Sequence, residues 1–133
     1  MSGVLVDSDI LIEVLRGRRV EVLERWITLA SNDEPLFCSP VSVAEIRHGM
    51  RERERESIER MLSSLNCIPI GAEIAGRAGD YLRVFHASHA VELGDAFIAA
   101  TSALHELPLW TQDRKHFPME ELRFYTGLHG PPR

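Results

Sequence analysis

The chain has 133 residues, of which 44% are hydrophobic and 26% charged, so we expect a single globular domain over residues 1–133. Its formal net charge of −5 excludes a protein that grips nucleic acid with its whole surface, although local contacts remain open. No apolar run approaches the roughly 20 residues that cross a bilayer, and the N-terminus lacks a signal-peptide pattern. We therefore expect a cytoplasmic protein with no membrane partner.

The first half of the chain contains two strand patterns and three helix patterns. In chain order, the strands are predicted at Val4 to Val6 and Leu36 to Cys38, and the helices at Asp9 to Arg16, Val20 to Ala30 and Pro40 to Gly49. Gly17 is the residue expected to end the first helix. Ser39 and Pro40 have the order of an N-cap followed by a first-turn proline, which predicts where the third helix begins.

The second half continues the alternation of strands and helices. A charged run, Arg51 to Glu56, leads into apolar positions up to Leu65, and is predicted to be a solvated helix face with pairs of the Glu56 and Arg60 type. The later strands are predicted at Cys67 to Ile70, Leu109 to Thr111 and Leu122 to Tyr125, and the later helices at Ile74 to Phe85 and Asp95 to Leu107.

The two cysteines, Cys38 and Cys67, lie far apart in the sequence and match no zinc spacing. We expect both to be free, buried thiols in a reducing compartment.

Alternating strands and helices predict an α/β fold, with a mainly parallel central sheet and helices on both faces. In such sheets ligands bind beyond the carboxyl ends of the strands, where the strand order reverses. Residues that directly follow the predicted strands are therefore the first candidates for a functional site.

Acidic side chains occur at these positions. The candidates are Asp7, directly after the first strand, Glu45, on the helix after the second strand, Asp95, at the start of a later helix, and Asp113, two residues after the fourth strand. If all four meet at one edge of the sheet, they cannot all stay ionised without a cation, because like charges raise one another's pKa values. Oxygen-only ligands favour Mg²⁺ or Mn²⁺, and such an ion can activate a water molecule for hydrolysis of a phosphodiester.

Each acid also has a purely structural interpretation. Asp7 fits an N-cap of the first helix, and Asp95 fits an N-cap after a glycine. Ser42 and Glu45 have the spacing of a capping box, although an earlier helix start would leave Glu45 free to project. Asp113 fits a turn acid. Convergence decides between these interpretations and a shared metal site, and spacing alone does not establish it.

Four segments together resemble the motif blocks of a PIN domain, in particular of the VapC-type toxins of bacterial toxin-antitoxin pairs. They are VDSDILIEVLRG, SPVSVAEIRHG, GDAFIAATSAL and LWTQDRKHF, in this order from Val6 to Phe117. The resemblance implies a Rossmann-like sheet of about five parallel strands, endoribonuclease activity on RNA, a homodimer, and an antitoxin whose binding blocks the site.

The resemblance also implies roles for individual residues. The metal ligands it implies for Mg²⁺ or Mn²⁺ are Asp7, Glu45, Asp95 and Asp113. Thr111 matches a family hydroxyl that helps to order the metal shell, and Ser8 stands where Thr or Ser is usual. The chain departs from many relatives at His116, where they carry an acid, so Asp113 must supply the fourth carboxylate. His116 itself is expected at the surface, with a place near the metal or phosphate as the alternative.

We expect arginines near the motifs to guide the RNA towards an acidic site. The candidates are Arg16, Arg18, Arg47 and Arg114.

Two other functions fit parts of the pattern. A non-catalytic binding module could use an acidic, metal-occupied pocket to capture an arginine-bearing partner. A haloacid-dehalogenase-type phosphatase would use the first acid after a strand as its nucleophile, but it needs a lysine upstream of its last acidic pair, and Lys115 lies downstream.

Overall fold

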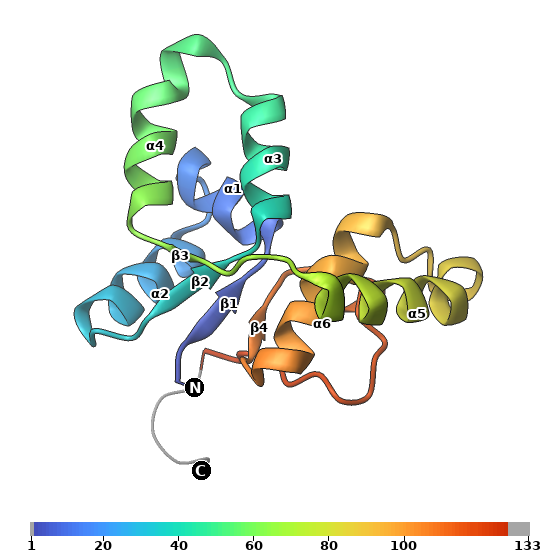
Figure 1. The fold of residues 1–133 in the computed structure, drawn as a ribbon. Coiled ribbons are helices and arrows are strands. Elements are labelled where there is room, and N and C mark those ends of the chain that lie inside the picture. The colour runs from blue at the N-terminus through green and yellow to red at the C-terminus, as the bar shows by residue number, and fades with distance from the viewer. Residues whose placement is uncertain (1, 128–133) are drawn as a thin grey trace.

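The structure, a computed structural model, describes residues 2–127 and is built around a four-stranded parallel sheet (Figure 1). β1 (Val4–Val6) is hydrogen-bonded to β2 (Leu36–Cys38) on one side and to β4 (Leu109–Trp110) on the other. β3 (Asn66–Cys67) pairs with β2 and forms an outer edge. The predicted α/β class with a parallel sheet is confirmed.

Helices cover both faces of this sheet, as Figure 1 shows. On one face lie α1 (Ser8–Arg16), α2 (Val20–Ser31), α3 (Pro40–Gly49), η1 (Glu52–Glu54) and α4 (Arg55–Ser63), and on the other α5 (Ala72–His89) and α6 (Leu93–His105). The short helix η2 (Arg114–His116) follows β4. α3 and α4 project together beyond the strands as a hairpin. Within the described residues, no helix has the length and apolar character to span a membrane.

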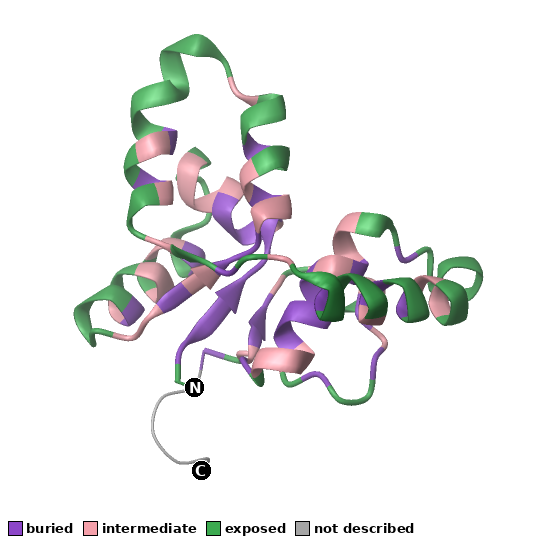
Figure 2. Cartoon of the chain, in the orientation of Figure 1, coloured by how far each residue is buried: buried purple, intermediate pink, exposed green. Residues whose placement is uncertain are grey.

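Alternation along β1 explains why the sheet needs cover on both sides. Leu5 packs into a core with α5 and α6, whereas Val4 and Val6 point into a second core with α1, α2 and α4. All three residues are buried, and Figure 2 shows the strand as the buried centre of the molecule. The near-continuous apolar run follows from this two-sided burial.

Local signals fix the helix ends. Gly17 adopts a left-handed conformation (φ 67°), and its N–H donates to the Glu13 carbonyl, which ends α1. The Ser39 hydroxyl accepts a hydrogen bond from the Val41 N–H at 3.1 Å, with Pro40 in the first turn of α3. Both predictions are confirmed, and α3 therefore begins too early for a capping box at Ser42.

The sheet is smaller than the five strands expected. Leu122 to Tyr125 makes only an isolated parallel bridge, in which Phe124 pairs with Leu109 of β4. The strand predicted at Cys67 to Ile70 is shorter and begins one residue earlier, at Asn66–Cys67.

The charged run before α4 behaves as a solvated surface. Arg60 donates to the Glu56 carboxylate at 3.1 Å, and both side chains are at least 70% exposed, which confirms the predicted pair. The apolar residues that follow, Ile58 and Met61, are buried in the core.

The order of the strands creates a crevice beside β1. The chain moves outward from β1 through β2 to β3, and then crosses back to place β4 on the opposite side of β1. Connections leave β1 and β4 in opposite directions, so the carboxyl ends of these two strands form the switch point at which open α/β sheets bind ligands.

Candidate active site

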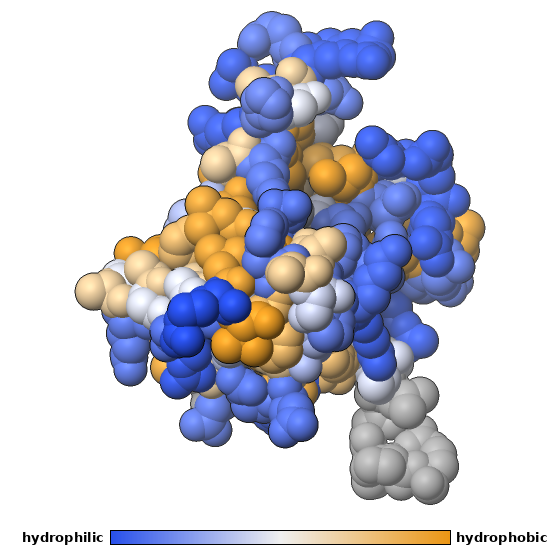
Figure 3. All heavy atoms as spheres, turned by 90° about the vertical axis from the view of Figure 1, so that its right-hand side faces the viewer, coloured by the Kyte–Doolittle hydropathy of each residue, from blue (hydrophilic) through white to orange (hydrophobic). Residues whose placement is uncertain are grey.

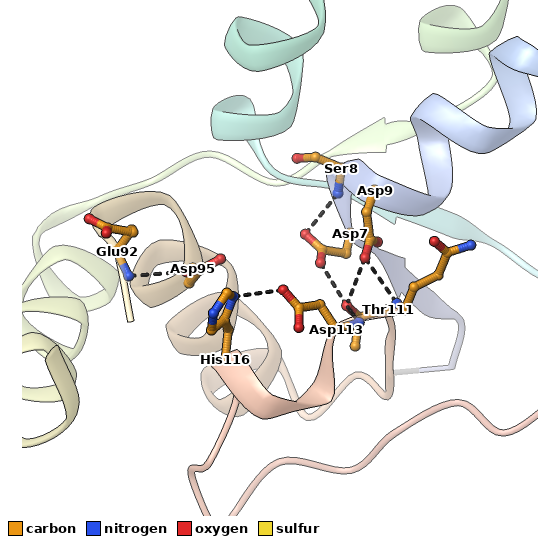
Figure 4. A network of polar contacts seen from close by, with 9 residues as sticks. Asp7, Ser8, Asp9, Glu92, Asp95, Thr111, Asp113 and His116 are labelled. Atoms are coloured by element: carbon orange, nitrogen blue, oxygen red, sulfur yellow. Dashed lines mark hydrogen bonds and ion pairs between the residues drawn. The ribbon is translucent and has the colours of Figure 1, made fainter. Parts of the chain in front are cut away.

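Asp7 and Thr111 directly follow the two strands of the switch point. Val6 and Trp110 are register partners, and the Asp7 N–H donates to the Trp110 carbonyl at 2.9 Å. The Thr111 hydroxyl donates to Asp7 Oδ2 at 2.8 Å, and the Ser8 N–H donates to Asp7 Oδ1 at the same distance (Figure 4). Asp7 is thus the N-cap of α1 and also a buried acid at the strand ends.

Asp9 joins Asp7 at this point, although the sequence indicated it only as the start of a helix. Its Oδ2 accepts from the Gln112 N–H at 3.0 Å, while its Oδ1 is buried and has no hydrogen-bond partner. The signal that could have found it is local. An N-cap at Asp7 puts Asp9 in the first turn of α1, so both carboxylates lie at the positive end of that helix.

Glu45 reaches the same region from α3. The Ser8 hydroxyl donates to Glu45 Oε1 at 2.5 Å and lies 2.7 Å from the buried hydroxyl of Ser42. A Cβ at Gly94 would lie 3.1 Å from Glu45 Oε2, so the glycine leaves room for this carboxylate beside α6. Sequence reasoning missed both Ser42 and Gly94 as neighbours of the site.

Asp95 lies at the third position of α6. The N-cap is Glu92, and the Glu92 N–H donates to Asp95 Oδ2 at 3.0 Å. The interpretation of Asp95 as an N-cap is therefore wrong by three positions. Asp95 Oδ2 thus caps the first turn of α6, and the side chain lines a pocket together with Asp7 and Glu45.

Asp113, the N-cap residue of η2, contacts His116 at the end of that short helix. Asp113 Oδ2 lies 2.6 Å from His116 Nδ1, and the Asp113 N–H donates to the Thr111 hydroxyl at 3.0 Å. His116 is only 29% exposed along its side chain, so it is less open to solvent than the expected surface residue. Figure 4 shows Asp113 between Thr111 and His116, facing the acids of β1 and α6.

These residues line one pocket of about 310 Å³. Its lining consists of Asp7, Ser8, Asp9, Ile12, Glu45, Gly94, Asp95, Ile98 and Asp113. The structure therefore brings together all four carboxylates that the sequence singled out, and adds Asp9. Among residues 2–127, no arginine or lysine belongs to this lining.

Burial and mutual repulsion act strongly on the acids. Burial, and secondly the charge of Asp9, raise the pKa of Asp7 from 3.8 to about 7. Burial is also the main cause that raises the pKa values of Asp9 and Asp95. Asp113 and Glu45 add repulsion at Asp95, which His116 partly offsets. At neutral pH the pocket thus favours either bound protons or a cation.

The donor atoms of the pocket suit a hard divalent cation. Carboxylate and hydroxyl oxygens surround it, and the unpartnered Asp9 Oδ1 is an oxygen that an ion would satisfy. Within the described part of the chain, however, no three His, Cys, Asp or Glu side chains lie close enough together to hold an ion as they stand. Glu45 is turned to Ser8 and Asp113 to His116, so binding requires these side chains to rotate.

Two of the four arginines proposed as RNA guides, Arg47 and Arg114, have other contacts. Arg47 donates to Glu59 at 2.8 Å and so joins α3 to α4. The Arg114 guanidinium stacks 4.7 Å from the centre of the Phe124 ring. Arg16 lines a second cavity of about 190 Å³ between α1, α3 and α4, whose lining mixes polar and apolar side chains. This cavity shares Ile12 and Glu45 with the acidic pocket.

Comparisons with known proteins show the family of the chain. The sequence profile of the PIN domain matches residues 4–122. Ribonuclease VapC10 of Mycobacterium tuberculosis is 45% identical over 119 residues, which cover 89% of this chain and 88% of that protein. A toxin-antitoxin complex from Klebsiella pneumoniae contains a chain 29% identical to this one, with a TM-score of 0.70 over 95% of this chain and 98% of the other. A DNA-bound VapBC complex from Salmonella typhimurium shares the fold, with 19% identity and a TM-score of 0.77 over 94% and 98% of the two chains.

Proposed function

Because the chain belongs to the PIN domain family, and within it to the VapC-type ribonucleases, we propose that it is an endoribonuclease and the toxin of a toxin-antitoxin pair. The observation that carries the proposal is the meeting of Asp7, Glu45, Asp95 and Asp113 in one pocket at the switch point of the sheet. Acting on RNA, the protein would work in the cytoplasm.

We propose that Mg²⁺ or Mn²⁺ serves this pocket. Its ligands would be Asp7, Glu45, Asp95 and Asp113, with Asp9 as a further oxygen donor. When bound, the ion supplies an acidified water molecule and offsets the charge that grows on the scissile phosphate.

The protein's own residues prepare the pocket for that chemistry. Thr111 donates to Asp7, and Ser8 donates to Glu45, so two carboxylates from distant parts of the chain are held by hydroxyls. The Gln112 N–H holds Asp9 through Oδ2. The other carboxylate oxygen, Oδ1, is buried without a hydrogen-bond partner. The fixed position of Asp7 reduces the reorganisation needed when the phosphodiester is cleaved, whereas Glu45 must leave Ser8 to reach an ion.

Cleavage of total RNA with and without a chelator tests this function. With Mg²⁺ or Mn²⁺ we expect discrete RNA fragments, because the acids need a cation to approach a phosphate. With excess EDTA we expect cleavage to fall to background, and added metal should restore it. Metal-dependent RNA binding without fragments would instead support the binding module, whereas cleavage that persists in EDTA would contradict the metal proposal.

We also propose two protein partners, a second copy of the chain and an antitoxin. Figure 3 views the side that carries α5 and α6, where apolar side chains gather between charged ones. Val84 on α5 and Leu93 on α6 are each 58% exposed, which supports a contact between copies. The second cavity, which adjoins the acidic pocket at Ile12 and Glu45, supports an antitoxin segment that places an arginine among the acids.

Light scattering of the purified protein checks both partners. Alone, the chain should have twice its 15.0 kDa mass. After co-expression with its antitoxin, the mass should increase and RNA cleavage should fall. A monomer at micromolar concentration would contradict the dimer, and a complex with undiminished cleavage would contradict inhibition at the pocket.

Membership of the PIN domain family leaves the haloacid-dehalogenase-type phosphatase without support.

A further inference from the structure

The two cysteines lie opposite each other in the sheet. Cys38 ends β2 and Cys67 ends β3, and the two are register partners in this parallel pair. Neighbouring strands lie about 4.8 Å apart, which falls within the roughly 4.4–6.8 Å between Cα atoms that a disulfide spans.

Both thiols are on the same face of the sheet. Cys38 packs in the core shared with α1, α2 and α4. Phe37 and Ile68, the neighbours of the two cysteines along the strands, contribute to the opposite core. Because side chains alternate along a strand, Cys67 points to the side of Cys38. Cys67 also helps to raise the pKa of the Cys38 thiol, which burial brings to about 12, as expected for adjacent sulfur atoms.

The two thiols differ sharply in access. Cys38 is 1% exposed, whereas Cys67 lies exposed on the edge strand, so the expectation that both are buried is wrong for Cys67. An oxidant in solution therefore reacts with Cys67 first, because Cys38 is shielded from solvent. This order is that of an attacking thiol and a resolving thiol.

We propose that Cys38 and Cys67 form a redox-sensitive pair that closes into a disulfide across β2 and β3. The oxidant is a low-molecular-weight disulfide. The Cys67 thiolate attacks one of its sulfur atoms, forms a mixed disulfide and releases one small thiol. Cys38 then attacks the Cys67 sulfur and passes its proton to the departing small thiolate, which leaves as the second small thiol. Two protein thiols are oxidised and one small disulfide is reduced.

The bond would enclose the segment that carries part of the proposed active site. Residues 39–66 lie between the two cysteines and form the projecting hairpin of α3 and α4. Glu45 lies on α3 within this segment. Cys38 also directly precedes Ser39, the N-cap of α3. A cross-link at the base of this segment restricts the unfolded chain and ties the edge strand to the sheet.

Oxidised glutathione added to the full-length protein tests the pair. We expect the intact mass to fall by two hydrogen atoms, both thiols to become unreactive, and peptide mapping to link Cys38 with Cys67. The melting temperature should rise by about 5–10 °C and return when dithiothreitol is added. These readouts do not depend on RNA cleavage, so they can fail while the proposed function holds.

Two variants separate this result from surface oxidation. Cys67→Ser should neither lose mass nor gain stability with the oxidant, because Cys38 is inaccessible. Cys38→Ala should retain one glutathione on Cys67. Wild-type protein that only gains glutathione, forms a disulfide between two chains, or keeps both thiols would overturn the proposal.

Discussion

Replacing Asp95 with Asn is expected to reduce RNA cleavage by about two to three orders of magnitude without unfolding the protein. The side chain lines the acidic pocket, so the substitution removes a negative charge from the proposed metal site. Loss of several kcal/mol of transition-state stabilisation corresponds to this range, since about 1.4 kcal/mol equals a factor of ten. The measurement is the initial rate of RNA cleavage at saturating Mg²⁺.

The fold should tolerate this change because the amide keeps the contact that matters for α6. Asp95 Oδ2 accepts from the Glu92 N–H, and an asparagine oxygen can accept the same bond. Asp80→Asn is the matched control, since Asp80 lies exposed on α5 and pairs only with Arg83 among the contacts described. Equal cleavage by Asp95→Asn and the control would refute a role for Asp95 in the reaction.

Replacing Asp7 with Asn should make the metal-free protein more stable at pH 8, although it removes a residue of the proposed active site. Folding raises the pKa of Asp7 from 3.8 to about 7, so its ionisation opposes folding. The resulting loss of stability begins above pH 3.8, grows as the pH rises, and is complete above pH 7. Asn carries no such penalty, and one pKa unit corresponds to about 1.4 kcal/mol, so the gain at pH 8 is up to roughly 4 kcal/mol.

Urea unfolding in the presence of EDTA measures this effect. The stability difference between Asp7→Asn and wild type should be much smaller at pH 5 than at pH 8, and Asp80→Asn should show no such dependence. Mg²⁺ should stabilise wild type at pH 8 more than it stabilises Asp7→Asn, because a cation offsets the buried charge only where the charge exists. A difference that does not change with pH would mean that Asp7 is not the titrating group.

Two acids, Asp7 and Asp9, stand between the apolar first strand and the apolar residues of α1. The structure gives both a place in the same network. Asp7 caps α1 and also accepts a hydrogen bond from the Thr111 hydroxyl, while Asp9 accepts one from the Gln112 N–H. The capping interpretation and the site interpretation of Asp7 are therefore compatible, because one carboxylate oxygen serves each purpose.

Local signals in the sequence were sufficient for most of the fold. Apolar periodicity gave the helices to within a few residues, and Gly17, Ser39 and Pro40 marked helix ends because their preferences act within one turn. Asp7 and Asp113 were recognised because they follow strands, and the carboxyl ends of parallel strands share one edge of a sheet. Glu45 and Asp95 were recognised from their places on helices.

Tertiary structure alone decided the contacts between segments that lie far apart in the chain. The sequence contains nothing that pairs Ser8 with Ser42 and Glu45, Thr111 with Asp7, or Cys67 with Cys38. Likewise, the predicted fifth strand makes only a single bridge to β4. The physical reason is the same in each case. Propensities and caps depend on neighbours in sequence, whereas side-chain partners depend on strand register and on how helices pack against the sheet.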